Sequence, residues 1–298
     1  MNFKTIGKCW LDVGLNHLSP TQINKPLCGW WYEYVYKTQE WRRARKPNAK
    51  MIAGNSAQHG WDGYFLFNQS QDEAIAAGIQ HYQKQKGLFI NDEKEMKQFE
   101  VNLEAIPKVI TNYIAALKDL EIKKVETVNS ERYVELWIDG ITVPYTGRTD
   151  METKNFFIEA KTKWQRRSGK PKKDGTHSFI NISAPKTPDA YHVNQVCFYK
   201  EATQKPGYLV YATPTDYKIY SSLEHEELGV EAQKQTIDNF FTKSKKRQNL
   251  LELSQKTTVE YVAKNYVEAD LNNINYYGYN EDEITEVKRF YNDKHYTH

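Results

Sequence analysis

The chain has 298 residues, with 41 Lys and Arg against 38 Asp and Glu, so its net charge is only +3. That length allows one large α/β domain, or a core with helical additions, and the near-balanced charge excludes a strongly basic protein whose overall field selects nucleic acid. The three cysteines include no CxxC pair, which excludes a disulfide framework, and no apolar run reaches the length of a membrane span.

Helical segments are predicted throughout the first 120 residues. Ser19 and Pro20 open the first helix as an N-cap and a favoured first helical residue. The spacing of apolar residues predicts two more helices, over about 55–85 and about 93–120, with Pro107 expected to kink or divide the last. We expect this N-terminal helical region to pack on the core that follows it.

Short β-rich runs separated by turn signals come next. They cover 123–128, 132–139, 141–151 and 155–163, with turns expected at Asn129-Ser130, Asp139-Gly140 and Lys154-Asn155. After a polar loop over 164–188 we expect a helix at 188–204, strands at 207–214 and 218–223, a helix at 228–254 and a short helix in the tail.

This order predicts an α/β fold with a central mixed sheet, made of an antiparallel meander plus a crossover helix and flanked by helices. We expect three regions in the chain. The N-terminal helical region covers 1–120, the core covers 121–223, and a C-terminal helical extension covers 224–298.

The most informative stretch runs from Gly147 to Lys161, where one predicted strand ends at Asp150 and the next carries Glu159 and Lys161. Side chains at i and i+2 of a strand share a face, so Glu159 and Lys161 project together. A hairpin between the strands can bring Asp150 beside Glu159. Two carboxylates at one point repel each other unless a cation lies between them, so the pattern predicts a metal site.

The expected metal is Mg²⁺ or Mn²⁺, as one or two ions held by Asp150 and Glu159, with the backbone carbonyl of Ala160 as a further ligand. Such an ion can polarise a phosphodiester oxygen and activate a water molecule for attack. Lys161 can orient that water or neutralise charge that grows on the phosphorus. The alternative for Glu159 and Lys161 taken alone is the wet face of an ordinary sheet.

The order of the motifs resembles the PD-(D/E)XK nuclease superfamily, in its RecB-like branch, whose pattern is GxxD, then (D/E)xK on a hydrophobic strand, then QxxxY on a helix. Here the three elements are Gly147–Asp150, Glu159–Lys161 and Gln195–Tyr199. The branch includes phage exonucleases and the mitochondrial genome maintenance exonuclease. The resemblance covers about 18–223 and implies a restriction-endonuclease-like core.

The QxxxY pair and an upstream histidine complete the site that the resemblance implies. Gln195 and Tyr199 are four residues apart and share one helical face, where they can reach a phosphate and hold the lysine in place. The family's metal-ligating histidine lies in a GxxxH pattern, which implies His59 here, although it follows Gly54 by five residues rather than four. The other candidates are His81, His177 and His192.

A basic segment follows the catalytic strand directly. Between Lys161 and Lys173, seven of thirteen residues are Lys or Arg, and Trp164 lies among them. Phosphates of a bound strand would pass here, and the Trp164 ring could stack on a base. The DNA-binding candidates are Lys163, Trp164, Arg166 and Arg167, and a solvated loop is the alternative.

The resemblance implies a metal-dependent DNA exonuclease of phage type in recombination, repair or replication, which acts on single-stranded or end-accessible DNA. DNA is then the partner, with a single-strand-binding or annealing protein as an expected companion, no membrane association, and no cofactor besides the metal. Because no cysteine follows Cys197, the iron–sulfur cluster of some relatives is excluded on ligand count. The first residues lack the apolar segment of a signal peptide, so we expect a cytoplasmic protein, in the host cytoplasm if a phage encodes it.

Three alternatives remain open. An endonuclease of restriction type would use the same triad, and a ring-forming duplex exonuclease like that of phage lambda would be a trimer. A non-catalytic DNA-binding module is the third, and the intact Asp150, Glu159 and Lys161 disfavour it because a decayed site usually loses the lysine or one carboxylate.

Overall fold

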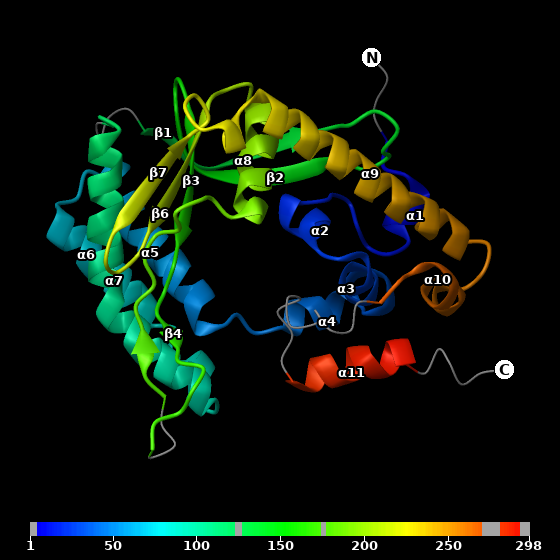
Figure 1. Ribbon diagram of the computed structural model, residues 1–298, viewed down its shortest axis with the longest axis horizontal. Helices are drawn as coiled ribbons and strands as arrows, with labels where there is room; N and C mark the ends of the chain where they lie inside the picture. The colour runs from blue at the N-terminus through cyan, green and yellow to red at the C-terminus, as the bar shows by residue number, and fades with distance from the viewer. Residues whose placement is uncertain (1–4, 123–126, 174–176, 270–280, 293–298) are drawn as a thin grey trace. The chain divides into compact units, whose positions relative to one another are not determined.

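The computed structural model of the protein describes residues 5–122, 127–173, 177–269 and 281–292 (Figure 1). The strands of the sheet that carries the predicted motifs are β1 (Thr127–Leu136), β2 (Tyr145–Thr153), β3 (Phe157–Thr162), β6 (Gly207–Ala212) and β7 (Tyr217–Ser221). Within the described ranges they form a five-stranded sheet of order β1-β2-β3-β6-β7. The pairs β2-β3 and β6-β7 are antiparallel, whereas β3 and β6 are parallel and are joined by the crossover helix α8 (Ala190–Thr203). The predicted α/β fold with a central mixed sheet is confirmed.

Strand β1 corrects part of the predicted meander. The prediction of a turn at Asn129-Ser130 is wrong, because β1 runs through both residues. The backbone departs from regular strand geometry at the next residue, Glu131, whose φ is 51°. The Ser130 hydroxyl bonds to the Asp62 carboxylate and to the Asp150 backbone oxygen, so contacts distant in sequence override the local turn preference. The expected run at 123–128 lies partly outside the described residues.

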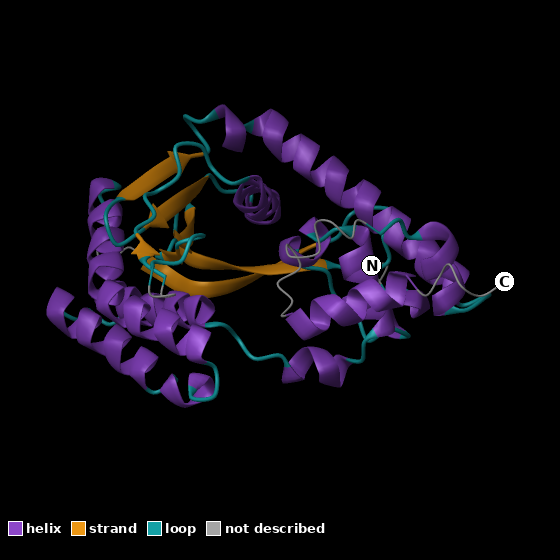
Figure 2. Ribbon diagram, turned by 60° about the horizontal axis from the view of Figure 1, so that its bottom comes forward, coloured by secondary structure: helices purple, strands orange, loops and turns teal. Residues whose placement is uncertain are grey.

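Three helices cover one face of the sheet (Figure 2). They are α5 (Ala49–Phe65), α6 (Gln71–Gln83) and α7 (Glu93–Asp119), whose buried side chains share one core with Met151, Ile158, Val210 and Ala212 of the strands. The helix expected over 55–85 is therefore two helices. Asn68 turns the chain with a φ of 55°, and Ser70 starts α6 with a capping box. Helix α7 continues through Pro107 and is not divided there.

Two glycines allow α5 and α6 to approach closely. A Cβ atom at Gly60 would lie 2.8 Å from the Ala74 carbonyl oxygen, and one at Gly78 would lie 3.0 Å from the Ser56 carbonyl oxygen. A side chain at either position would push the helices apart. The glycines therefore fix the position of α5, which passes beside the candidate site.

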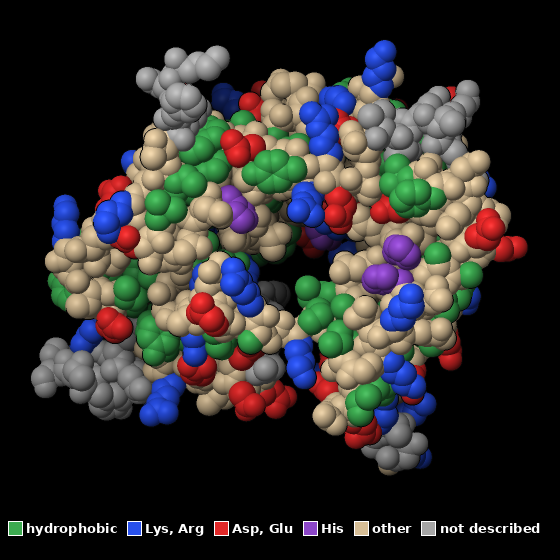
Figure 3. Space-filling view, turned by 180° about the vertical axis from the view of Figure 1, so that it is seen from behind, with side chains coloured by type: hydrophobic (Ala, Val, Ile, Leu, Met, Phe, Trp, Pro, Cys, Tyr) green, Lys and Arg blue, Asp and Glu red, His purple; other side chains and the backbone are tan. Residues whose placement is uncertain are grey.

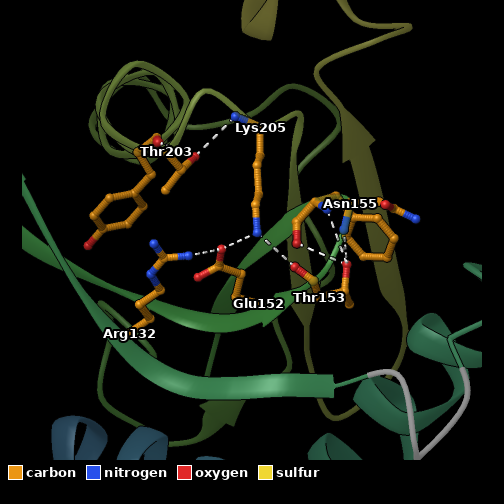
Figure 4. A network of polar contacts seen from close by, with 8 residues as sticks. Arg132, Glu152, Thr153, Asn155, Thr203 and Lys205 are labelled. Atoms are coloured by element: carbon orange, nitrogen blue, oxygen red, sulfur yellow. Dashed lines mark hydrogen bonds and ion pairs between the residues drawn. The ribbon is translucent and has the colours of Figure 1, made fainter.

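The start of β3 is held by a polar network around Glu152, which is 1% exposed (Figure 4). Arg132 of β1 and Lys205, which follows α8, both pair with the Glu152 carboxylate. Lys205 also donates to the Thr153 backbone oxygen at 3.0 Å. The network ties β1, β2 and the crossover together at the end of the sheet away from Lys161.

Contacts divide the chain into two units. Unit 1 consists of Met1–Arg45, Glu135–Gly147 and Lys234–His298, and unit 2 consists of Lys46–Val134 and Arg148–Gln233. All the candidate site residues lie in unit 2. The expected boundaries at 120 and 223 stay predictions about the organisation of the chain.

The helices of unit 1 are short near the N-terminus. They are α1 (Lys8–Leu11), α2 (Pro20–Asn24), α3 (Leu27–Trp31), a π-helical turn η1 (Tyr32–Tyr36) and α4 (Gln39–Ala44), followed late in the chain by most of α9 (Val230–Ser254), α10 (Val259–Tyr266) and α11 (Glu281–Asn292). Ser19 caps α2 with a capping box as predicted, but the first helix then breaks at Lys25 because Pro26 starts a new one. The remaining short elements are η2 (Lys86–Phe89), η4 (Glu226–Leu228), β4 (Arg166–Arg167) and β5 (Phe179–Ile180).

No helix in the described residues combines the length and apolar character needed to cross a membrane. On the face shown in Figure 3, Lys and Arg side chains are scattered among Asp and Glu. This mixing agrees with the small net charge of the chain.

Candidate active site

The β2-β3 hairpin brings Asp150 and Glu159 together. The strands pair at Met151 with Ile158 and at Glu152 with Phe157, which puts Asp150 opposite Glu159 at the next position. There the Asp150 carboxylate accepts a hydrogen bond from the Ala160 backbone N–H at 2.7 Å. At this position the Asp150 side chain, rather than a backbone carbonyl, accepts the hydrogen bond from β3. This bond holds the Asp150 carboxylate against β3.

The carboxylates of Asp150 and Glu159 lie close enough to interact with each other. Glu159 is 1% exposed, and its Oε2 atom has no donor among the described residues. Burial, together with the charge of Asp150, raises the pKa of Glu159 to about 8. Burial also raises the pKa of Asp150, against the opposing effect of Lys161. Such a pair requires either a shared proton or a cation.

Lys161 supplies one positive charge to the pair. Its ammonium is bonded to Glu159 Oε1, and the side chain is 21% exposed. Burial by itself lowers the pKa of Lys161, but the charges of Glu159 and Asp150 outweigh this effect and the pKa is raised. Lys161 therefore carries its proton at neutral pH, and part of its side chain is exposed to solvent.

The predicted pair on α8 also reaches the site. Gln195 donates to the Tyr199 hydroxyl oxygen at 3.0 Å, and the Arg148 backbone N–H donates to the same oxygen at 3.3 Å. Burial and the charge of Glu159 raise the pKa of Tyr199, which keeps the phenol neutral. Because its oxygen accepts two hydrogen bonds, its own proton is left to donate on the side of the carboxylates.

Helix α5 presents Asp62, rather than His59, to these carboxylates. His59 is exposed, and its ring lies 4.9 Å from that of His81. Asp62 accepts from the Ser130 hydroxyl at 3.0 Å, and that hydroxyl also lies 3.3 Å from the Asp150 backbone oxygen. Burial raises the pKa of Asp62 to about 7, and the charge of Asp150 contributes in the same direction.

Several buried polar atoms around the site lack partners among the described residues. Tyr113 of α7 is fully buried with an unpaired hydroxyl, and burial followed by the charges of Asp150, Asp62 and Glu159 raises its pKa. The other unpaired atoms nearby on α5 are Gln58 Nε2, Trp61 Nε1 and Asp62 Oδ1. Unpaired buried groups are costly, so each of these atoms is available to a ligand or to water.

Asp62 and Tyr113 were missed from the sequence, although one signal pointed toward the first. Gln58, not His59, lies four residues after Gly54, and Asp62 lies four further on, so the three share one face of α5. Gly54 packs against Thr162 of β3, since a Cβ there would lie 3.2 Å from the threonine hydroxyl. The four-residue spacing of Gly54, Gln58 and Asp62, rather than His59, therefore identifies the face of α5 that lies against the sheet. Nothing in the local sequence distinguishes Tyr113 from an ordinary core tyrosine.

The donor set suits an oxygen-seeking divalent cation. Asp150 and Glu159 offer carboxylate oxygens, one of them without a donor, which are the ligands that Mg²⁺ and Mn²⁺ prefer. Across the described residues, no three His, Cys, Asp or Glu side chains come close enough to form a complete metal site. The remaining ligands would come from backbone oxygens, water and substrate, as is usual for Mg²⁺.

The basic segment after β3 forms a small hairpin in which β4 pairs with β5. Arg166 and Arg167 are exposed on it, and the Lys163 ammonium lies 5.7 Å from the centre of the Tyr211 ring. Trp164 differs from the expectation. It is 4% exposed and belongs to the core under the sheet, where its indole N–H bonds to Thr162, so it has no free face for a base.

Searches against protein-family models and among curated proteins found no match for this chain. Among solved structures it is similar to the crystal structure of SSO0001, with 22% identity and a TM-score of 0.26 over 53% of this chain and 70% of that one. It is also similar to a structure named "putative exonuclease" from Eubacterium rectale, with 11% identity and a TM-score of 0.40 over 80% of this chain and 84% of that one. Likeness at this level carries no conclusion about activity, so the function rests on the residues of the site.

Proposed function

We propose that this chain is a metal-dependent nuclease that hydrolyses phosphodiester bonds of DNA, as an exonuclease. The observation that carries the proposal is the interaction of the half-buried Asp150 carboxylate with the buried Glu159 carboxylate, with the Lys161 ammonium bonded to Glu159. Two like charges held close together with little solvent destabilise the fold. A bound catalytic cation would offset their repulsion and would explain why both are present. The neutral phenol of Tyr199 beside the pair adds a hydrogen-bond donor.

The ion would be Mg²⁺ or Mn²⁺, held by Asp150 and Glu159, with the backbone oxygen of Ala160 as a further ligand. When bound, it supplies Lewis-acid polarisation of the phosphate and lowers the pKa of water. Asp62 accepts from the Ser130 hydroxyl, which also lies close to the Asp150 backbone oxygen, and the charge of Asp150 acts on Asp62. Its proposed role is to complete the negative field that attracts the cation, whereas the resemblance had implied His59 as a metal ligand.

The protein's own groups position the substrate and stabilise the charge that develops during attack. The Lys161 ammonium orients the attacking water or neutralises charge on the phosphate oxygens, which is often the largest single contribution in such sites. Tyr199, held by Gln195 and the Arg148 backbone, donates its proton into the same space. Lys163, Arg166 and Arg167 are proposed to hold the phosphates of the strand that leaves the site.

The test is digestion of end-labelled single-stranded, duplex and closed-circular DNA with Mg²⁺, Mn²⁺ or EDTA. Wild type is compared with Lys161→Met and with Lys154→Ala, a matched control because Lys154 is an exposed lysine of the same hairpin. We expect metal-dependent release of label from linear DNA by wild type and by Lys154→Ala, and a loss of about 10²-fold or more in Lys161→Met.

Other outcomes replace the proposal by stated alternatives. Cuts in closed-circular DNA would make the protein an endonuclease with the same triad. Binding of DNA without cleavage under any metal would make it a binding module. Circular dichroism of each variant shows that a loss of activity does not reflect unfolding.

A further inference from the structure

His192 lies on the same face of α8 as Gln195 and Tyr199, three and seven residues before them. Its ring is next to Tyr211, with 5.5 Å between the ring centres. Tyr211 in turn is the register partner of Lys161 on the neighbouring parallel strand, so the two side chains project from the same face of the sheet. These positions place His192 beside the lysine of the candidate site, in a role that the proposed mechanism does not use.

A short chain of hydrogen bonds fixes which nitrogen of His192 carries the proton. The Asp189 backbone N–H donates to the Tyr211 hydroxyl oxygen at 3.0 Å, and that oxygen lies 2.7 Å from His192 Nδ1. Among the described residues the Tyr211 hydroxyl has no other acceptor, so the arrangement favours donation of its proton to Nδ1. Since Nδ1 accepts, a neutral ring must carry its hydrogen on Nε2.

The charges around His192 favour that neutral ring. Burial lowers its pKa to about 3, and Lys161 of β3 and Lys163, which follows β3, act in the same direction, while Asp189 at the start of α8 opposes them. The remaining neighbour, Tyr211 of β6, is a neutral phenol at ordinary pH because burial raises its pKa. The ring therefore stays uncharged where two ammonium groups already lie.

The Nε2 atom is the remaining polar atom of the ring. In the described part of the chain it has no hydrogen-bond partner, and it is not among the unpaired atoms that are closed off from solvent. A fixed N–H donor between Lys161 and Lys163 matches an anion with oxygen acceptors. The backbone of a nucleic acid offers such an oxygen at every phosphodiester.

We propose that His192 is a positioning residue whose Nε2–H donates, as an uncharged group, to a non-bridging oxygen of a phosphodiester bound beside Lys161 and Lys163. The inference rests on the proposed function and extends it to a residue that contacts the substrate backbone. A neutral donor and a cation differ in their effect on the salt dependence of binding. It adds affinity without releasing a counterion, so it leaves the salt dependence of binding unchanged.

The test measures binding of an end-labelled single-stranded DNA oligonucleotide in EDTA across a series of salt concentrations. His192→Phe is expected to weaken binding about tenfold at every salt concentration, with the slope of log affinity against log salt unchanged. Lys163→Met is the matched comparison, and it is expected to reduce that slope by about 0.7. His192→Gln, which keeps an amide donor at a similar reach, is expected to recover most of the affinity.

A measurement on the unaltered protein guards against misfolded variants. Nitrogen-15 spectra of labelled histidines are expected to show His192 neutral with its proton on Nε2, and the Nε2 signal is expected to shift when the oligonucleotide is added. In Tyr211→Phe, which lacks the phenol proton, the ring is expected to populate both neutral tautomers.

The outcomes separate this inference from the nuclease proposal. If the wild type binds and cuts DNA but His192→Phe binds equally well, or loses slope as Lys163→Met does, the role of His192 is overturned and the nuclease stands. A proton on Nδ1, or a charged ring at neutral pH, overturns it as well. If the wild type neither binds nor cuts DNA, both proposals fall together.

Discussion

The charge of Asp150 acts on the carboxylate of Glu159, although Glu159 is almost wholly buried. Without metal, the folded protein relieves this repulsion by holding a proton. The pKa of Glu159 is raised from an ordinary value of 4.5 to about 8, so the folded state binds a proton that the unfolded state has released. The contribution to stability is full below about pH 4.5 and is lost as the pH rises toward about 8.

The first prediction follows from this sign. In EDTA, the urea midpoint of wild type is expected to fall between about pH 5 and pH 8 relative to that of Glu159→Gln, which has no proton to lose. Adding Mg²⁺ at the upper pH is expected to stabilise wild type and not the variant. Parallel curves for the two proteins in EDTA would contradict the assignment.

The second prediction concerns the phenol on α8. Tyr199→Phe removes the oxygen that accepts from Gln195 and from the Arg148 backbone, so kcat is expected to fall about tenfold while the protein stays folded. Tyr191→Phe is the matched control, because Tyr191 is an exposed tyrosine on the same helix. Steady-state rates and thermal unfolding of both variants check the prediction, and equal rates would remove Tyr199 from the site.

The third prediction separates the two candidates on α5. Asp62→Asn is expected to lower activity and metal affinity by about tenfold or more, since groups that support a metal site typically have effects of this size. His59→Ala is expected to leave both within about twofold, because the His59 ring is exposed beside His81. Metal titrations of the cleavage rate distinguish the variants, and the reverse order of effects would restore His59 as the ligand.

The fourth prediction concerns the basic hairpin. Trp164→Ala is expected to destabilise the fold by about 3–5 kcal/mol, because it empties a core position. Arg167→Ala is expected to leave stability unchanged and to reduce the salt slope of single-strand binding by about 0.7. Urea unfolding and salt-dependent binding measure the two effects separately. A stable Trp164→Ala variant with weak DNA binding would support the stacking role that the burial of the ring contradicts.

The fifth prediction concerns Glu152, which is buried and paired with both Arg132 and Lys205. Lys205→Ala is expected to destabilise the protein by about 1–2 kcal/mol, because the carboxylate keeps Arg132 but loses one partner. The activity of the folded fraction should not change. Urea unfolding with activity normalised to folded protein is the check, and a loss of activity without a loss of stability would place Glu152 in the site.

The sequence predicted the hairpin and α8 well because both carry strong local signals. The two-residue alternation around Glu159 and the four-residue spacing of Gln195 and Tyr199 describe regular elements whose faces follow from geometry. In the structure Lys161 bonds to Glu159, Gln195 bonds to Tyr199, and the charge of Glu159 acts on Tyr199. Their catalytic roles remain proposals.

Other features escaped the sequence because they depend on packing between distant segments. Trp164 lies in a segment with seven basic residues, which suggests a solvated loop, yet the core beneath the sheet buries its ring. Ser130 and its neighbour Asn129 form a turn signal, but Ser130 bonds to Asp62, which is sixty-eight residues away, and stays in a strand. The secondary-structure propensity of a residue reflects only its local sequence, so it does not predict conformations that distant contacts determine.

The two units differ in when their parts leave the ribosome. Within unit 1, Tyr291 of α11 donates to the Cys28 backbone oxygen, and Glu286 pairs with Lys37. These contacts of the N-terminal residues cannot form until the C-terminal helix has been synthesised. The long-range contacts of unit 2 lie between residues 46 and 233. Because non-local contacts form slowly and late, unit 2 can reach its fold while unit 1 is still being synthesised. Nascent chains halted shortly beyond residue 233 would then already protect Asp150 and Glu159 from proteolysis, while Cys28 would still react with thiol reagents.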